Sequence, residues 1–116
     1  MIHLHEKNQE RKRLNGLIAK STMKVPVAVG EVGKRVFSDG ALSKKHKELT
    51  ALTVAVVQNC FDCIENRVEE VLHLGATDAE IAETLDVGAI MGGTVSMKSV
   101  RHAFAVMDEV KKGVTQ

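Results

Sequence analysis

The sequence lacks tryptophan and tyrosine, and its 116 residues include only three phenylalanines, one proline and two cysteines. A disulfide-rich secreted scaffold needs more cysteines at wider spacing, so that class is excluded. One proline and nine glycines are too few for the tight turns of an all-β fold, which favours helices. No apolar run approaches the roughly 20 residues that span a bilayer, and the N-terminus lacks the apolar stretch of a signal peptide. We therefore expect a cytoplasmic protein that does not bind membranes.

The composition that remains is typical of a globular helical domain. Hydrophobic residues make up 44% of the chain and charged residues 27%, which is too apolar for a disordered protein. The length suits one domain spanning 1–116, in which 1–25 form a helical N-terminal arm. Because aromatics are scarce, the core must consist of aliphatic residues, alanine and methionine. We expect such a small core to be completed by self-association.

Charge is distributed unevenly along the chain. Residues 1–48 contain eleven Lys/Arg and five Asp/Glu, whereas residues 49–116 contain five and ten. The basic half has one aromatic residue and no recognition motif. It therefore lacks the side chains that stack on nucleic-acid bases or read their edges, and we expect no nucleic-acid partner. We expect instead that the two halves pack together, within or between subunits, and compensate each other's charge.

Apolar periodicity and capping signals predict five or six helices and no strands. We expect helices over residues 3–20, 27–37, 44–58, 61–74, 78–91 and 95–111. Ser43 is the expected N-cap of the third helix, and Thr77 and Glu80 form a capping box for the fifth. The residues expected to face inward are Leu49, Leu52, Val56, Ile64, Val68, Val71, Leu72, Ile81, Leu85, Ile90, Met91, Met97, Val100, Phe104, Met107 and Val110.

Cys60 and Cys63 carry the clearest chemical signal. A break between two helices near Asn59 places Cys60 at the N-terminus of the second helix and Cys63 one turn into it. Both sulfurs then share a face of the helix and can form a disulfide. The partial positive charge of a helix N-terminus lowers the pKa of a thiol. Arg67 follows Cys63 by four residues and is placed to stabilise a thiolate. The arrangement predicts a redox pair.

Two other interpretations of the cysteines remain. A metal site is the weakest, because the chain has no second C-x-x-C, and its histidines do not follow zinc-ligand spacing. We expect no metal and no other cofactor. Two buried cysteines acting as small hydrophobic residues are a stronger alternative. A thioredoxin fold is disfavoured because the motif does not follow a strand.

The motif stands in an ordered set of segments. Residues 42–52 (LSKKHKELTAL) lead into 60–64 (CFDCI), which is followed by 75–81 (GATDAEI) and the glycines at 92 and 93. Together these resemble the carboxymuconolactone decarboxylase superfamily, and specifically its alkylhydroperoxidase D-like branch, over roughly 26–110. The resemblance implies an all-α fold that assembles as homotrimers or homohexamers. It also implies reduction of a small hydroperoxide, or exchange with a protein disulfide, at the expense of an unknown thiol reductant.

The resemblance also implies roles for individual residues. Cys63 corresponds to the more accessible nucleophile and Cys60 to the resolving cysteine, while Glu48 occupies the position of a glutamate in a proton relay. Arg67 stands where the family has a histidine base, and Asp62 stands where some members have a histidine. Arg67 can hold a thiolate but cannot take up its proton. Asp62 opposes thiolate formation unless it pairs with Arg67 or another cation.

The residue that takes up the thiol proton therefore depends on the tertiary structure. Glu48, His46 and His102 are the candidates, provided that the fold brings one of them to the cysteines. Twelve residues of straight helix span about 18 Å, so Glu48 needs a turn near Asn59 or a subunit contact to approach the site.

The sequence thus predicts an all-α antioxidant oxidoreductase with peroxiredoxin activity, with Cys63, Cys60, Glu48 and Arg67 as its catalytic residues. Two alternatives stay open. One is a decarboxylase or lactone-handling enzyme that does not use redox chemistry, as other branches of the superfamily imply. The other is a non-catalytic helical assembly module in which the cysteines only pack.

Overall fold

The computed structural model describes residues 1–113, which form six α-helices and one 3₁₀ turn and contain no strand. The elements are α1 (Leu4–Ala19), α2 (Val25–Val36), α3 (Lys44–Val57), α4 (Phe61–His73), α5 (Asp78–Gly92), η1 (Thr94–Ser96) and α6 (Met97–Lys111). The all-α prediction is confirmed, and each expected helix is present within three residues of its predicted bounds. None of the helices described is long and apolar enough to cross a bilayer.

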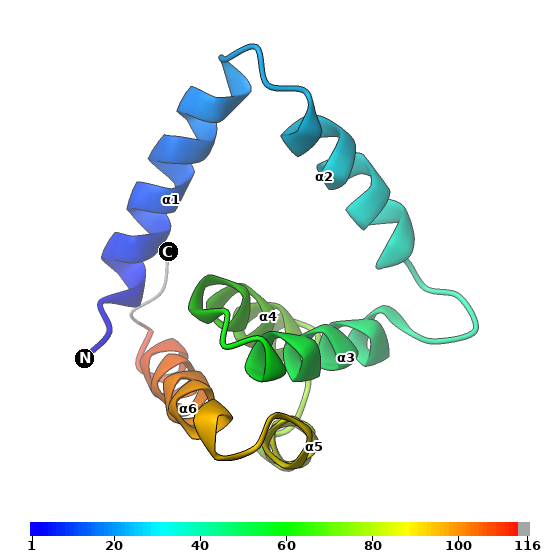
Figure 1. Cartoon of the computed structure of the whole chain (residues 1–116), viewed down its shortest axis with the longest axis vertical. Coiled ribbons are helices and arrows are strands. Elements are labelled where there is room, and N and C mark those ends of the chain that lie inside the picture. Colours follow the sequence, from blue (N-terminus) through cyan, green and yellow to red (C-terminus); the bar gives the residue numbers. More distant parts are fainter. Residues whose placement is uncertain (114–116) are drawn as a thin grey trace.

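The helices divide into a packed core and an arm, a term that from here on covers both α1 and α2. Helices α3 to α6 pack against one another, whereas α1 and α2 form an arch that extends away from them (Figure 1). Leu4 is the only buried residue of α1, and α2 contains none. Between residues 12 and 36 every residue except Gly33 is exposed. The arm therefore has an apolar surface that this chain does not cover by itself.

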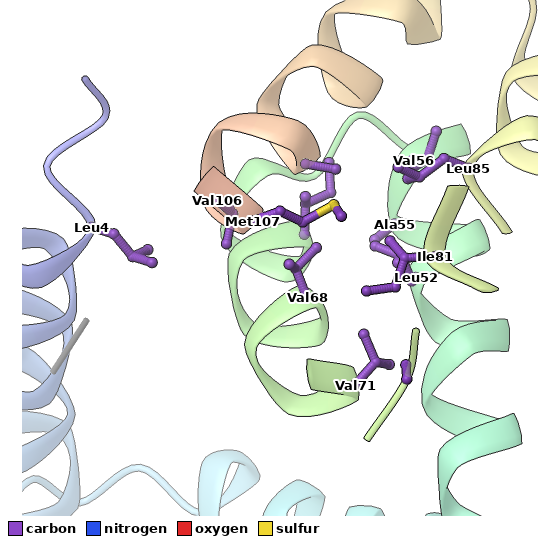
Figure 2. Packing of buried hydrophobic residues seen from close by; sticks show 13 residues of the cluster. Leu4, Leu52, Ala55, Val56, Val68, Val71, Ile81, Leu85, Val106 and Met107 are labelled. Atoms are coloured by element: carbon purple, nitrogen blue, oxygen red, sulfur yellow. The ribbon is translucent and has the colours of Figure 1, made fainter. Parts of the chain in front are cut away.

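The core is built from apolar side chains that five helices contribute (Figure 2). Its fully buried residues are Leu52 and Val56 of α3, Ile64, Val68 and Val71 of α4, Ile81 of α5, Ala103 and Val106 of α6 and Leu4 of α1. Helices α3 and α5 approach closely because residue 88 is glycine. A Cβ atom added there would lie 2.9 Å from Cγ1 of Val56.

Four residues expected in the core are exposed instead. They are Ile90, Met91, Met97 and Phe104. The buried side of α6 carries His102, Ala103, Val106 and Met107. Phe104 lies two positions from His102 and from Val106, which is about 200° around a helix, so it points away. Ile90 and Met91 lie in the last turn of α5, where the described residues do not cover them.

Side-chain caps define the helix starts as predicted. The hydroxyl of Ser43 accepts a hydrogen bond from the His46 N–H at the start of α3. At the start of α5, Thr77 accepts from the Glu80 N–H, and the Glu80 carboxylate accepts from the Thr77 N–H. Both caps satisfy backbone donors that a helix leaves unpaired at its first turn.

The basic and acidic halves of the chain pair within one molecule, as expected. Cations from residues 1–48 contact carboxylates from residues 49–116 in five places. The pairs are Lys7–Glu65, Arg11–Asp62, Arg11–Glu65, Lys44–Glu70 and Lys45–Glu80. Two of these contacts converge on Glu65, which is fully buried.

Candidate redox site

The turn between α3 and α4 positions the cysteine pair. Asn59 adopts a left-handed conformation with φ 53°, which asparagine tolerates better than most residues. The Cys60 N–H donates to the Ala55 carbonyl and the Asn59 N–H to the Val56 carbonyl, at 3.0 and 3.1 Å, the pattern of a Schellman motif. The Ser99 hydroxyl of α6 donates to the Asn59 side chain at 2.6 Å. The predicted break at Asn59 is therefore confirmed, and α6 anchors it.

Cys60 is the N-cap of α4, and Cys63 lies one turn into the helix. Their Cα atoms are 5.2 Å apart, and a disulfide joins the two sulfurs. The Cys63 N–H donates to the sulfur of Cys60 at 3.3 Å. Both residues are half-buried. Within one chain, the pair is thus neither sealed in the core nor fully open to solvent.

Glu48 and Arg67 meet across the α3–α4 hairpin. The guanidinium of Arg67 donates to a carboxylate oxygen of Glu48 at 2.6 Å, and Glu48 is only 2% exposed. The turn at Asn59 therefore brings Glu48 to α4 without a subunit contact. The guanidinium also lies 4.6 Å from the ring centroid of Phe37, a cation–π arrangement. The charge of Arg67 is consequently shared with Glu48 rather than held for the cysteines alone.

Asp62, between the cysteines, pairs with a cation that the sequence did not reveal. Its carboxylate accepts from Arg11 of α1 at 3.2 Å, and its side chain is 77% exposed. Arg11, rather than Arg67, therefore offsets the negative charge that would oppose a thiolate.

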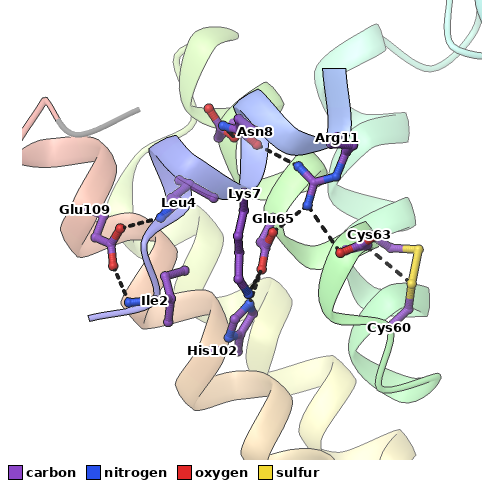
Figure 3. A network of polar contacts seen from close by, with 12 residues as sticks. Ile2, Leu4, Lys7, Asn8, Arg11, Cys60, Cys63, Glu65, His102 and Glu109 are labelled. Carbon is purple, nitrogen blue, oxygen red and sulfur yellow. Dashed lines mark hydrogen bonds and ion pairs between the residues drawn. A yellow bond between two sulfur atoms is a disulfide. The ribbon is translucent and has the colours of Figure 1, made fainter. Parts of the chain in front are cut away.

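The buried carboxylate of Glu65 lies at the centre of a polar network (Figure 3). It accepts from Lys7 at 3.0 Å and from Arg11 at 2.7 Å, and it lies 2.7 Å from Nε2 of His102. Burial acts to raise the pKa of Glu65, but the hydrogen bonds of His102, Lys7 and Arg11 outweigh burial and hold the pKa below its ordinary value. We call Lys7, Arg11, Glu65 and His102 the Glu65 cluster.

The Glu65 cluster also contacts Phe61, which lies between the cysteines next to Asp62. The ring of His102 stacks on the ring of Phe61, with centroids 4.2 Å apart and planes at 10°. Of the candidate bases, His102 thus reaches the redox motif through Phe61, and Glu48 reaches Arg67. His46 is exposed and lines a different hollow with Leu49, Glu80 and Thr84.

Sequence reasoning missed Lys7, Arg11 and Glu65. Glu65 follows Ile64 and precedes Val68 by three residues, so it lies on the apolar stripe of α4. A carboxylate at such a position must be paired when it is buried. An acidic residue on an apolar stripe therefore predicts that cationic or hydrogen-bonding partners lie nearby. Nothing in the local sequence could show that its partners come from residues 7, 11 and 102.

A polar hollow of about 570 Å³ opens beside the hairpin. Arg67 and Asn66, which follow Cys63 in α4, line it together with Glu48 of α3 and the polar face of α1. The complete lining is Asn8, Arg11, Lys12, Asn15, Glu48, Asn66, Arg67, Glu69, Glu70 and His73. Within residues 1–113, no group of three or more His, Cys, Asp or Glu side chains is arranged to hold a metal ion.

Comparison with known proteins identifies relatives of this helical arrangement. Uncharacterized protein 4 in the cox locus of Paracoccus denitrificans is 40% identical over 79 residues, which cover 68% of this chain and 71% of that protein. A solved structure of a carboxymuconolactone decarboxylase family protein from Thermotoga maritima matches with a TM-score of 0.81 at 29% identity, over 90% of this chain and 88% of that one. A role in an antioxidative response has been suggested for it.

A second solved structure, a family member from Legionella pneumophila, matches with a TM-score of 0.69 at 30% identity. It covers 90% of this chain and 86% of that one. The model of the carboxymuconolactone decarboxylase family itself matches residues 24–109, which include both cysteines, Glu48 and Arg67. The chain therefore belongs to the carboxymuconolactone decarboxylase family.

Proposed function

We propose that this protein is a thiol-dependent oxidoreductase of the alkylhydroperoxidase type, which reduces small hydroperoxides or partner disulfides. The observation that carries the proposal is the half-buried Cys60–Cys63 pair in the first turn of α4, with its sulfurs joined. A helix N-terminus favours thiolates. The antioxidative role suggested for the Thermotoga maritima relative supports the same chemistry.

The reaction with a hydroperoxide proceeds in two steps. The thiolate of Cys63 attacks the terminal peroxide oxygen and breaks the O–O bond, which leaves a sulfenic acid on Cys63 and releases an alcohol after protonation. The Cys60 thiol then attacks the Cys63 sulfur, forms the disulfide and releases water. Two electrons pass from the thiol pair to the peroxide. A dithiol, or two monothiols, returns them and closes the cycle.

The hydrogen bond at the N-cap supports this assignment of the two cysteines. When a reductant thiolate attacks Cys63, the sulfur of Cys60 departs as a thiolate. The Cys63 N–H already points at that sulfur, so it stabilises the leaving group, and a better leaving thiol departs faster. Cys63 thus forms the mixed disulfide, and Cys60 resolves it.

Glu48 and Arg67 would assist at Cys63. Arg67 follows Cys63 by one helical turn and contributes positive charge on the same side of α4. Glu48 is the group of this pair that can exchange a proton, because arginine stays protonated. We assign Glu48 as proton carrier and Arg67 as the group that positions it and polarises the thiol.

The exposed apolar side of the arm supports self-association. Val25, Val29, Val32 and Val36 follow one side of α2 and are all exposed, and such a continuous patch usually marks an interface. We propose that a second copy of the chain covers it in a homotrimer or homohexamer. The reducing cytoplasm, where thiols are regenerated, is the compartment that suits the reaction.

Mass spectrometry after one equivalent of hydrogen peroxide tests the redox function. The reduced chain should lose two hydrogens, and replacement of either cysteine by serine should prevent the loss. In the Cys60→Ser variant, a sulfenic acid on Cys63 should be trapped by dimedone. If both thiols of the wild-type chain remain free and unreactive near neutral pH, the proposed function is wrong.

A further inference from the structure

Each of the two residues between the cysteines contacts a side chain from another helix. The Phe61 ring stacks on His102 of α6, and the Asp62 carboxylate pairs with Arg11 of α1. These contacts bear on the chemistry because the four-residue segment 60–63 must keep a narrow range of conformations for its two sulfurs to meet. The more conformations the segment explores in the dithiol state, the less favourable ring closure becomes.

The two side chains that contact Phe61 and Asp62 converge on one carboxylate. Arg11 donates to one oxygen of Glu65 at 2.7 Å, and Nε2 of His102 lies 2.7 Å from the other. Glu65 has no exposed surface. An ionised group in this position depends on its partners, and they in turn lose their orientation when it is removed. Glu65 thus links α1 and α6 at the first turn of α4.

We propose that Glu65 is a positioning residue for the redox pair: through Arg11 and His102 it restrains Phe61 and Asp62 and so favours closure of the Cys60–Cys63 disulfide. The inference rests on the proposed redox function of the pair, and it adds a residue that does not touch the reacting sulfurs. It assigns the same role to its two intermediaries, Arg11 and His102, which contact the residues between the cysteines directly.

The negative charge of Glu65 favours the disulfide, as does its restraint of the segment between the cysteines. The carboxylate of Glu65 offsets the positive charges of Lys7 and Arg11 near the first turn of α4. Without it, these cations would stabilise a thiolate and hence the reduced pair. The variant Glu65→Gln removes the charge and weakens the restraint while preserving the shape of the side chain. Both effects shift the pair toward the dithiol.

The test is the equilibrium of the full chain with dithiothreitol at pH 7. Reduction of the protein disulfide forms two cysteine thiols and cyclic oxidised dithiothreitol, so two electrons and two protons move. Alkylation and mass spectrometry give the two fractions. We expect Glu65→Gln to shift the equilibrium constant about fivefold toward the dithiol, which corresponds to about 1 kcal/mol. The Arg11→Gln variant loses the restraint on Asp62 but also a cation that favours a thiolate, so it should shift the equilibrium constant in the same direction by a smaller factor.

Glu109→Gln is the matched control. Glu109 is another buried carboxylate that binds α1, through the N–H groups of Ile2 and Leu4, but it has no contact with Phe61 or Asp62. Its substitution should leave the redox equilibrium within about twofold of the wild type, a change of less than about 0.5 kcal/mol. A purely structural role of Glu65 would destabilise the oxidised and reduced chains equally and leave the equilibrium constant unchanged.

The outcomes separate the two proposals. If folded Glu65→Gln and Arg11→Gln have the wild-type equilibrium constant, the positioning role is wrong and the redox function stands. If Glu65→Gln does not fold, Arg11→Gln alone decides, since Arg11 lies on the largely exposed helix α1. If the wild-type chain forms no Cys60–Cys63 disulfide with one equivalent of hydrogen peroxide, both proposals fail.

Discussion

Arg67 and Glu48 lie 19 residues apart in the sequence and form a 2.6 Å ion pair between α4 and α3. The pair places a permanent cation one turn after Cys63, at the position where the family resemblance implies a histidine base. Its partner, Glu48, is buried and can exchange protons. In the function we propose, positive charge and proton uptake are divided between these two residues, whereas a single histidine would supply both.

Replacement of Arg67 by alanine tests the charge. The variant leaves Glu48 buried without its closest cation and removes the positive charge near Cys63. Alkylation of the thiols should therefore require higher pH, and the rate at pH 7 should fall about fivefold, the effect of about 1 kcal/mol. Iodoacetamide kinetics between pH 5 and 9 measure this, with Arg67→Lys as the charge-preserving control. An unchanged pH profile in Arg67→Ala would remove Arg67 from the mechanism.

Acid should destabilise the fold through its buried carboxylates. Burial acts to raise the pKa of Glu109, but backbone hydrogen bonds from Leu4 and Ile2 and nearby positive charge outweigh burial and hold the pKa below its ordinary value of 4.5. The pKa of Glu65 is lowered as well. Because the unfolded chain binds protons more readily, this stabilisation is complete above about pH 4.5 and is lost as pH falls through the lowered values. Urea unfolding between pH 3 and 7 should show the decline.

The variant Glu109→Gln provides the comparison for that pH dependence. It should be less stable than the wild type at pH 7 by roughly 1–3 kcal/mol, since a charged acceptor of two backbone N–H groups is replaced by a neutral one. The difference should shrink toward pH 3. A constant difference across this range would show that Glu109 does not contribute through its ionisation.

The approach of α5 to α3 depends on Gly88. Alanine at this position would place a methyl group 2.9 Å from Val56, and such overpacking typically costs about 1–3 kcal/mol. Thermal and urea unfolding should detect the loss, and Val56→Ala in the same chain should recover part of it. Gly30→Ala is the matched control, because nothing lies within 4 Å of its Cβ position in α2. It should be neutral or stabilise by up to about 1 kcal/mol through helix propensity.

The apolar side of α2 should control assembly. Charged residues at two central positions, in the double variant V29E/V32E, should dissociate the proposed oligomer, because an unpaired charge in an apolar interface is costly. Sedimentation velocity measures the result. Lys34→Glu alters charge on the same helix outside the valine stripe and should leave the oligomer intact. A wild-type chain that sediments as a monomer at micromolar concentration would contradict the assembly.

Local patterns along the chain were enough to predict the helices and most of the packed core. Ser43, Thr77 and the break at Asn59 mark helix ends through hydrogen bonds that form within a few residues of themselves. The 3.6-residue period identified Leu52, Val68 and other core positions. The juxtaposition of Cys60 and Cys63 also follows from local geometry, since residues three apart share a helix face.

Exposure was predicted less well where it depends on neighbouring elements. Ile90 is apolar and fits the period of α5, yet it is 81% exposed because no described element covers the end of that helix. The valines of α2 follow one side of the helix but lie on an arm that leaves the core. Periodicity identifies a side of a helix, but only the packing of other elements, or of another chain, determines whether that side is buried.

The two cysteines, scarce in an otherwise ordinary composition, and the segments around them were sufficient to indicate the family and the disulfide of the pair. The surroundings of that pair were not accessible in the same way. Glu65, Arg11 and His102 are separated by 37 to 91 positions, and whether a charged side chain is solvated or buried against partners depends on which helices meet. Contacts between distant residues are set by the free energy of packing the whole chain, which no local pattern contains.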